Sequence, residues 1–272
     1  MTTALRTVRE SVGDVAADLE RAGCESARLD AELLVAAALG AGGRDRVHLE
    51  AGQPMSADAE ASLAALAARR AAREPVAYIL GRREFRRLDI AVDRRVLIPR
   101  PETELLVEAA IDLPRGARVH DVGTGSGAIA LAIKDERADL VVTGSDSSAA
   151  AVEVARANAQ LLGLDVEFEC AADLPPGAEG ADLVVANLPY VAEAEWEALA
   201  PEITAYEPRD ALVAGPTGLE VIEQLVAAAP AGTAVAVEHA PWQAGPVRSL
   251  MAAARTLRDL ARHERVTIGR LP

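Results

Sequence analysis

Short apolar runs alternate with stretches of helical periodicity between residues 119 and 162, and this alternation restricts the fold more than any other feature. The predicted order is strand, helix, strand, helix, at 119–122, 128–133, 140–145 and 149–162. Strands and helices that alternate at this spacing build a parallel sheet covered by helices on both faces. We therefore expect an α/β domain. Further strands are predicted at 166–168, 183–186, 234–238 and 265–268.

Residues 1–75 place apolar side chains at three- and four-residue steps, which is the period of an amphipathic helix. A first helix is expected to stop at Gly23, and Ser26 can cap a second one that stops near Gly40. A third helix is expected to begin at a cap on Ser56. We therefore predict a small helical domain over residues 1–75.

Residues 76–100 are predicted to form a β-hairpin linker. Two strand-like runs occur there, at 84–90 and at 96–98, with a polar turn between them. A helix then begins the second domain, which is expected to span residues 101–272.

Composition disfavours several classes of function. Asp and Glu outnumber Lys and Arg by 42 to 28, and no dense basic run occurs, so we expect no direct nucleic-acid binding. Cys24 and Cys170 lack metal-ligand spacing and are expected to be buried free thiols. His120 and His239 are interpreted as exposed, ordinary polar residues, and no metal is expected. No apolar run approaches membrane-spanning length, so a cytoplasmic location without membrane contact is predicted.

A glycine-rich run, His120-Asp121-Val122-Gly123-Thr124-Gly125-Ser126-Gly127, lies at the end of the first strand of the predicted sheet, just before a helix. Open α/β sheets bind their ligands at the carboxyl ends of the strands, and glycine lets the backbone approach a ligand closely. The helix that follows offers free N–H groups. A tight turn without a ligand is the alternative for this motif alone.

Asp146 ends the next strand about 20 residues later, where a carboxylate can accept hydrogen bonds from both ribose hydroxyls of a nucleoside cofactor. NAD and S-adenosylmethionine share that ribose, so Asp146 does not separate them. The glycines at 123, 125 and 127 alternate and depart from the G-x-G-x-x-G pattern of dinucleotide sites, which favours S-adenosylmethionine.

The tetrapeptide Asn187-Leu188-Pro189-Tyr190 directly follows the predicted strand 183–186, at the same edge of the sheet. An amide or aryl-amine nitrogen is a poor nucleophile because its lone pair is delocalised. The Asn187 side-chain oxygen and the Leu188 carbonyl could accept its two hydrogens, and Tyr190 offers a flat face to a planar acceptor. A turn whose Asn caps the backbone is the alternative. Together with the glycine-rich run and Asp146, the tetrapeptide favours methyl transfer to a planar nitrogen.

Beyond these motifs, the chain resembles the PrmC/HemK family of peptide chain release factor N5-glutamine methyltransferases over nearly its whole length. The stretches that carry the resemblance are Leu29 to Leu34, Glu74 to Gly81, Val96 to Glu104, the glycine-rich run and Tyr206 to Arg209. Among them, Ile98 to Glu104 is particularly specific to the family.

The resemblance implies a Rossmann-like S-adenosylmethionine-dependent methyltransferase domain with a small N-terminal helical domain for substrate recognition. It implies class 1 peptide chain release factors as substrate, methylated on the glutamine of their Gly-Gly-Gln loop, and we expect a monomer. The cofactor-binding residues carried over by position are Gly123, Thr124, Gly125, Ser126, Gly127, Asp146, Asp173, Leu174 and Asn187. The glutamine amide would be bound by Asn187, Leu188, Pro189 and Tyr190, with Asn187, Pro189 and Tyr190 as catalytic residues.

Three departures from the family pattern stand out. Leu188 replaces the first proline of the usual Asn-Pro-Pro-Tyr; its carbonyl is retained, and we predict reduced but real activity. The segment Glu238 to Gln243 stands where relatives show a glycine soon after the acidic residue. A helix that is expected to end near Ala254 leaves a short connection to the last strands.

Three alternative functions remain at this point. A DNA adenine N6-methyltransferase could hold an exocyclic amine with the same tetrapeptide after base flipping. A methyltransferase-like binding protein with weakened catalysis is suggested by Leu188 and by the altered segment at Glu238. An NAD oxidoreductase is the weakest of the three.

Overall fold

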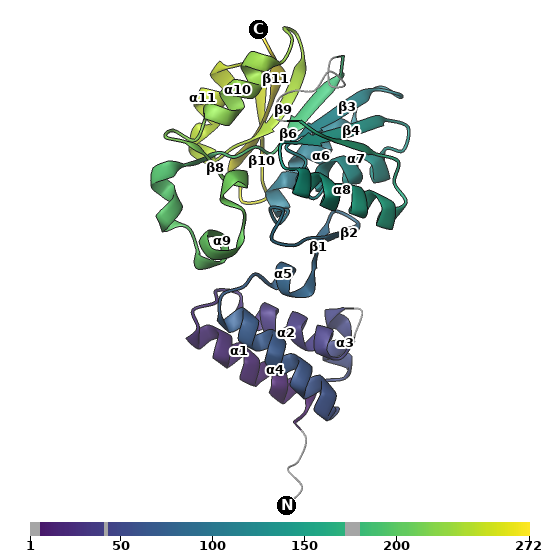
Figure 1. Ribbon diagram of the computed structural model, residues 1–272, viewed down its shortest axis with the longest axis vertical. Coiled ribbons are helices and arrows are strands. Elements are labelled where there is room, and N and C mark those ends of the chain that lie inside the picture. The colour runs from purple at the N-terminus through teal and green to yellow at the C-terminus, as the bar shows by residue number, and fades with distance from the viewer. Residues whose placement is uncertain (1–5, 41–42, 172–179) are drawn as a thin grey trace, which may run out of the picture. The chain divides into compact units, whose positions relative to one another are not determined.

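The computed structural model describes residues 6–40, 43–171 and 180–272, which fall into two compact units (Figure 1). One unit contains Met1–Gly81 together with Pro201–Tyr206, and the other contains Arg82–Ala200 and Glu207–Pro272. Among the described residues, none of the helices has the length and apolar character that a membrane crossing requires.

The first unit is helical, as expected from the periodicity of the sequence. Its helices are α1 Val8–Arg21, α2 Ala27–Ala38, α3 Arg44–Leu49, α4 Ala57–Ala71, α5 Val76–Leu80 and α9 Pro201–Tyr206. Leu19, Leu34 and Leu63 lie in its buried core. Ser56 caps α4 through its side chain, whereas Ser26 precedes α2 without a capping hydrogen bond, and its hydroxyl donates to Asp30.

A buried arginine ties the segment Pro201–Tyr206 to the helical unit. Arg70 is only 4% exposed, and it donates to Asp30 Oδ2 at 2.8 Å and to Glu202 Oε1 at 2.9 Å. Arg73 also donates to Glu202, and the Tyr206 hydroxyl donates to the Ala72 carbonyl. A short helix that follows the tetrapeptide in sequence is thus part of the N-terminal unit.

The second unit is built on a seven-stranded sheet in the order β10-β11-β9-β6-β3-β4-β5. Its strands are β3 Arg118–Val122, β4 Val141–Asp146, β5 Glu167–Cys170, β6 Leu183–Ala186, β9 Ala234–Glu238, β10 Ala252–Arg258 and β11 Glu264–Arg270. The first five of these pair in parallel, whereas β11 and β10 are antiparallel. The expected Rossmann-like α/β fold is therefore confirmed.

Helices cover this sheet along its length. They are α6 Glu104–Ile111, α7 Ala128–Glu136, α8 Ala149–Leu162, α10 Glu220–Ala228 and α11 Ala244–Ser249, with 3-10 turns η1 Pro101–Thr103, η3 Glu193–Ala198, η4 Arg209–Ala211 and η5 Pro241–Gln243. Figure 1 shows α7 and α8 beside β3 and β4, and α10 and α11 beside β9 and β11. Two very short strands, β7 Val191–Ala192 and β8 Val213–Gly215, form a separate pair.

The hairpin differs from the prediction. Its strands are β1 Arg82–Phe85 and β2 Leu88–Ala91, so the turn falls inside the run that we expected to be one strand. Arg86 takes a φ of 53° there, a conformation that the strand-like pattern of its neighbours does not reveal. The predicted strand at 96–98 is absent, because the Ile98 amide donates to the Glu207 carboxylate and not to a neighbouring strand.

Three further expectations were wrong. The helix α11 ends at Ser249, well before Ala254, and β10 begins at Ala252. Cys170 is exposed, although Cys24 is buried as expected. Both His120 and His239 are buried, and hydroxyl groups on neighbouring strands, together with the Ala240 carbonyl for His239, satisfy their ring nitrogens.

The buried histidines have complete hydrogen bonding. His120 bonds with Thr143 Oγ1 and Ser145 Oγ at 2.8 and 2.9 Å, and burial lowers its pKa to about 4. His239 bonds with Thr267 Oγ1 at 2.8 Å. Both rings therefore act as neutral structural groups. The two histidines have a structural role, as interpreted from the sequence, but they are buried and not exposed.

Candidate active site

The order in which the chain adds strands to the sheet reverses at β3. The chain runs from β3 to β4 and β5 on one side, then returns to place β6 on the other side of β3. Ligands of open α/β sheets bind in the crevice at such a switch point, beyond the carboxyl ends of the strands. Because β3 and β6 are parallel, the glycine-rich run and the tetrapeptide both begin at this edge.

Backbone hydrogen bonds shape the glycine-rich run. The Thr124 amide donates to the Ser145 carbonyl at 2.9 Å, and the Gly127 amide donates to the Thr124 carbonyl at 2.8 Å. Gly123 has a φ of 70°, and a Cβ placed on it would lie 2.9 Å from Leu188 Cδ2. The positive φ favours glycine at that position, and the Leu188 side chain would have to shift to admit a Cβ.

The buried Asp121 side chain holds the glycine-rich run through a hydrogen bond with Thr124. This side chain is fully buried and accepts a hydrogen bond from Thr124 Oγ1 at 2.7 Å. Burial raises the pKa of Asp121 to about 7. We did not single out this residue from the sequence, although its position within the motif was a signal.

Asp146 connects the run to the end of β4. Its Oδ2 accepts from the Gly125 amide and its Oδ1 from the Ser148 amide, both at 2.9 Å. Each carboxylate oxygen keeps a further lone pair, so these bonds leave acceptor capacity for a ligand hydroxyl. The expected ribose contact stays a prediction.

The tetrapeptide is oriented by residues that are far away in sequence. Asn187 Nδ2 donates to Thr103 Oγ1 at 3.1 Å, and the Tyr190 hydroxyl donates to Glu238 Oε1 at 3.1 Å. Burial and the nearby Glu238 carboxylate raise the pKa of Tyr190, so its phenol stays protonated and remains a donor. Gln243 Nε2 donates to the Tyr190 carbonyl at 2.9 Å, which holds the backbone from the other side.

Leu188, the departure from the family pattern, joins the two motifs. Its side chain is 7% exposed and packs in the apolar cluster that includes Val184 and Val237. Its Cδ2 lies against Gly123, so the tetrapeptide and the glycine-rich run are in direct contact.

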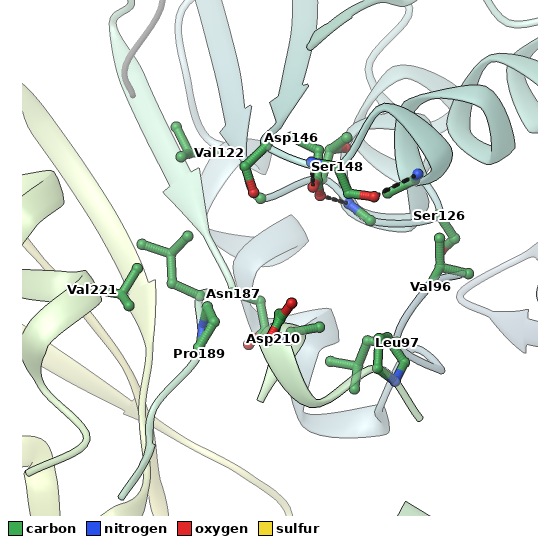
Figure 2. A pocket seen from close by; sticks show the side chains of 18 of the residues that line it. Val96, Leu97, Val122, Ser126, Asp146, Ser148, Asn187, Pro189, Asp210 and Val221 are labelled. Atoms are coloured by element: carbon green, nitrogen blue, oxygen red, sulfur yellow. Dashed lines mark hydrogen bonds between the residues drawn. The ribbon is translucent and has the colours of Figure 1, made fainter. Parts of the chain in front are cut away.

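A cavity of about 410 Å³ opens between the two motifs (Figure 2). This volume lies within the range of about 300–1,000 Å³ that is usual for small-molecule sites. The residues of both motifs that line it are Val122, Gly123, Thr124, Gly125, Ser126, Asp146, Asn187, Leu188 and Pro189. Its other walls include Val96, Leu97, Asp210 and Val221, which Figure 2 shows around the same space.

Two predicted residues of the described chain, Gly127 and Tyr190, do not line the cavity. Gly127 faces the core, where a Cβ would meet Leu131 and Phe168, and Tyr190 points its hydroxyl at Glu238. Asp173 and Leu174 lie outside the described residues. The other predicted residues are brought together around the one cavity.

The residues of the cavity fit S-adenosylmethionine. A Cβ on Gly125 would meet no atom within 4 Å, so the backbone there is open to a ligand. Asp146 supplies a carboxylate for hydroxyl groups, while Val122 and Leu97 supply apolar surface. In the part of the chain that the structure describes, no three His, Cys, Asp or Glu side chains group as metal ligands.

Glu207 was missed from the sequence, although it lies in the stretch Tyr206 to Arg209. Its carboxylate accepts from the Ile98 amide at 3.1 Å and pairs with Arg100. It thereby holds the wall of the cavity that residues 95–99 form. Two stretches that carry the family resemblance, more than 100 residues apart, thus meet at one buried carboxylate.

Comparisons with known proteins identify the family. Residues 12–81 match the family model described as the PrmC N-terminal domain, and residues 101–215 match the methyltransferase small domain. A release factor glutamine methyltransferase of Burkholderia pseudomallei is 44% identical over 279 residues, covering 94% of this chain and 96% of that protein. The one from Geobacter sulfurreducens is 42% identical, covering 82% of this chain and 79% of that protein.

A solved structure shares the fold over about two thirds of this chain. The hMettl16 catalytic domain matches 66% of this chain and 74% of its own chain, with a TM-score of 0.54 and 15% identity. The likeness to this structure concerns the fold alone. The sequence relatives have a much higher identity to this chain than the solved structure has, and they cover most of the chain. By these relatives and the two family models, this chain belongs to the family of release factor glutamine methyltransferases.

Proposed function

We propose that this protein transfers a methyl group from S-adenosylmethionine to the side-chain amide nitrogen of the glutamine in the Gly-Gly-Gln loop of class 1 peptide chain release factors. The observation that carries the proposal is one cavity lined by both the glycine-rich run and the tetrapeptide. The relatives named for release factor glutamine methylation support the choice of substrate.

The cofactor supplies an electrophilic sulfonium methyl group. On the protein side, the amides and open backbone of residues 123–126 bind its methionine end, and the Asp146 carboxylate accepts from its ribose hydroxyls. Asp146 is itself fixed by the Gly125 and Ser148 amides, so it is oriented before any ligand arrives.

The tetrapeptide binds the glutamine amide that accepts the methyl group. Asn187 Oδ1 and the Leu188 carbonyl accept the two hydrogens of the glutamine amide, which favours a pyramidal nitrogen whose lone pair points at the methyl group. Pro189 keeps Leu188 extended. A nitrogen that has gained a methyl group is a strong acid and releases its proton to water, so catalysis rests on positioning and on oriented acceptors.

The helical unit serves to recognise the protein substrate. A release factor is far larger than the cavity, and a domain that matches the PrmC N-terminal model provides additional surface for it. We expect the enzyme to act as a monomer in the cytoplasm, without direct contact to nucleic acid, in keeping with its formal net charge of −14.

Transfer of a tritiated methyl group tests the proposal. Purified protein is incubated with labelled S-adenosylmethionine and either a class 1 release factor or duplex DNA. We expect label on the release factor and none on the DNA. Label on DNA alone would instead identify an adenine methyltransferase, and cofactor binding without any transfer would identify a binding protein that has lost catalysis.

A further inference from the structure

Residues 191–213, which we call the α9 loop, start directly after the tetrapeptide and return to the cavity. The Val191 amide donates to the Leu212 carbonyl at 2.9 Å, and the pair of β7 and β8 closes the loop at this point. The residues of its returning end that line the cavity are Pro208, Asp210, Ala211 and Val213. Its middle, the helix α9, belongs to the helical unit. One loop therefore joins the helical unit to the site of the reaction.

Glu202 anchors α9 in the helical unit. Its carboxylate accepts from Arg73 at 2.8 and 2.6 Å and from Arg70 at 2.9 Å. The side chain of Arg70 is 5% exposed and that of Glu202 is 17% exposed, so water competes little for this ion pair. Removal of one charge from a buried pair leaves the other charge poorly compensated. A single substitution at Glu202 should therefore loosen the anchor.

Two consecutive residues at the end of α9 are held by different units. The Tyr206 hydroxyl donates to the Ala72 carbonyl of the helical unit at 2.7 Å. The next residue, Glu207, accepts from the Ile98 amide of the second unit at 3.1 Å. Consecutive Cα atoms are about 3.8 Å apart, so a displacement of α9 acts directly on Glu207. Movement of the helical unit thus reaches the wall of the cavity through the chain itself.

We propose that Glu202 is a positioning residue that couples the helical unit to the acceptor side of the cavity. The inference rests on the proposed function, in which the helical unit recognises the release factor and the tetrapeptide binds its glutamine. A domain that is joined to its neighbour by one linker moves relative to it by default, and a second anchored connection restricts this motion. A restricted helical unit presents the glutamine in a defined position, and a misplacement of about 1 Å can lower a rate by about a hundredfold.

The first test loosens the anchor. Glu202→Gln keeps the shape of the side chain and removes its charge. We expect kcat for a class 1 release factor to fall by about ten- to a hundredfold, while KM changes less than about threefold. The Kd and the stoichiometry for S-adenosylhomocysteine, measured by calorimetry, should match those of wild type, because the glycine-rich run is held by hydrogen bonds within the second unit.

Asp30→Asn is a matched control. Asp30 lies on α2 and also accepts from Arg70, at 2.8 Å. Both variants remove one negative charge from the same buried arginine, so both should lower the midpoint of thermal unfolding by similar amounts. Asp30→Asn leaves α9 anchored, and its kcat should stay within about twofold of wild type. Equal losses of kcat in the two variants would assign the effect to a weakened helical unit and overturn the coupling.

Tyr206→Phe tests the coupling without a change of charge. It keeps the ring and removes the hydrogen bond to the Ala72 carbonyl, so it serves where Glu202→Gln does not fold. We expect kcat to fall by about two- to tenfold, which corresponds to the loss of one hydrogen bond. Wild-type kcat in this variant would contradict the coupling.

The two proposals fail in different ways. Wild-type protein that does not methylate a release factor contradicts the proposed function. Wild-type activity together with unchanged kcat in Glu202→Gln contradicts the coupling and leaves the proposed function in place.

Discussion

The glycine-rich run and the tetrapeptide follow neighbouring parallel strands, yet they are held in different ways. The run is shaped by its own backbone and by the adjacent strand, and its buried acid, Asp121, lies three residues from the threonine that bonds it. The tetrapeptide depends on a buried acid 48 residues away, Glu238, and on Thr103, 84 residues away. The side of the cavity formed by the glycine-rich run is a local structure, whereas the side formed by the tetrapeptide is assembled by residues from the whole domain.

The largest effect is expected at Asn187. Asn187→Ala removes the side-chain oxygen that accepts a hydrogen bond from the glutamine amide, and it should lower methylation of a release factor by about a hundredfold or more. Cofactor binding should remain nearly intact, because the glycine-rich run is held without Asn187. Calorimetry with S-adenosylhomocysteine, beside the transfer assay, measures both sides of the cavity. A parallel loss of cofactor affinity would break the separation of the two.

The pH dependence of stability probes the buried acid. The folded-state pKa of Glu238 is about 7, above the ordinary value of 4.5, so its contribution to stability is full below pH 4.5 and is lost as the pH rises to 7. Glu238→Gln removes this loss. Relative to wild type, the free energy of unfolding of the variant should rise by roughly 3 kcal/mol across that window.

Denaturant titrations at a series of pH values make this measurement. Glu264→Gln, a half-buried acid on β11 that pairs with Arg248 and Arg258, is the control and should show no such gain. A constant difference between Glu238→Gln and wild type would mean that Glu238 is ionised without cost.

Gly123→Ala tests the contact between the two motifs. The alanine would need a φ of 70° and would place its Cβ 2.9 Å from Leu188 Cδ2. We expect cofactor affinity to fall by about tenfold, which is about 1.4 kcal/mol. Gly116→Ala is a matched control, since Gly116 has a φ of 78° but no atom within 4 Å of an added Cβ. An equal loss of affinity in both variants would attribute the effect to general strain.

The smallest effect is expected at Leu188. Leu188→Pro restores the family pattern and stiffens the tetrapeptide, so turnover should rise by about two- to threefold. Stability should fall by about 1 kcal/mol, because the packing of Leu188 in its apolar cluster is lost. Steady-state kinetics and thermal unfolding measure the two effects. Unchanged turnover would show that rigidity at this position does not limit the enzyme.

The contrast also explains what the sequence could predict. Apolar strands followed by Gly123–Gly127 or by Asn187 are local patterns, and local patterns predicted the parallel sheet and the edge where the cavity opens. Glu207, Glu238 and Thr103 act through partners far away in the chain, and no local periodicity marks them. The buried His120 was misjudged for the same reason, because the hydroxyls that satisfy it lie on β4.

The hairpin shows where a local sequence pattern fails to predict the structure. The run 84–90 has the composition of one strand, but a turn at Arg86 with positive φ divides it into β1 and β2. Its neighbour at 96–98 has strand-like residues whose backbone bonds a side chain instead. In both places the partner of the backbone decided the structure.

The most direct test of the account locates the methyl group. A class 1 release factor is incubated with S-adenosylmethionine and either wild-type protein or Asn187→Ala, then digested and sequenced by tandem mass spectrometry. We predict one added methyl group on the glutamine side chain of the Gly-Gly-Gln loop with wild type, and an unmodified loop with the variant. A methyl group on any other residue, or equal modification by both proteins, would contradict the assignment of the tetrapeptide as the acceptor site.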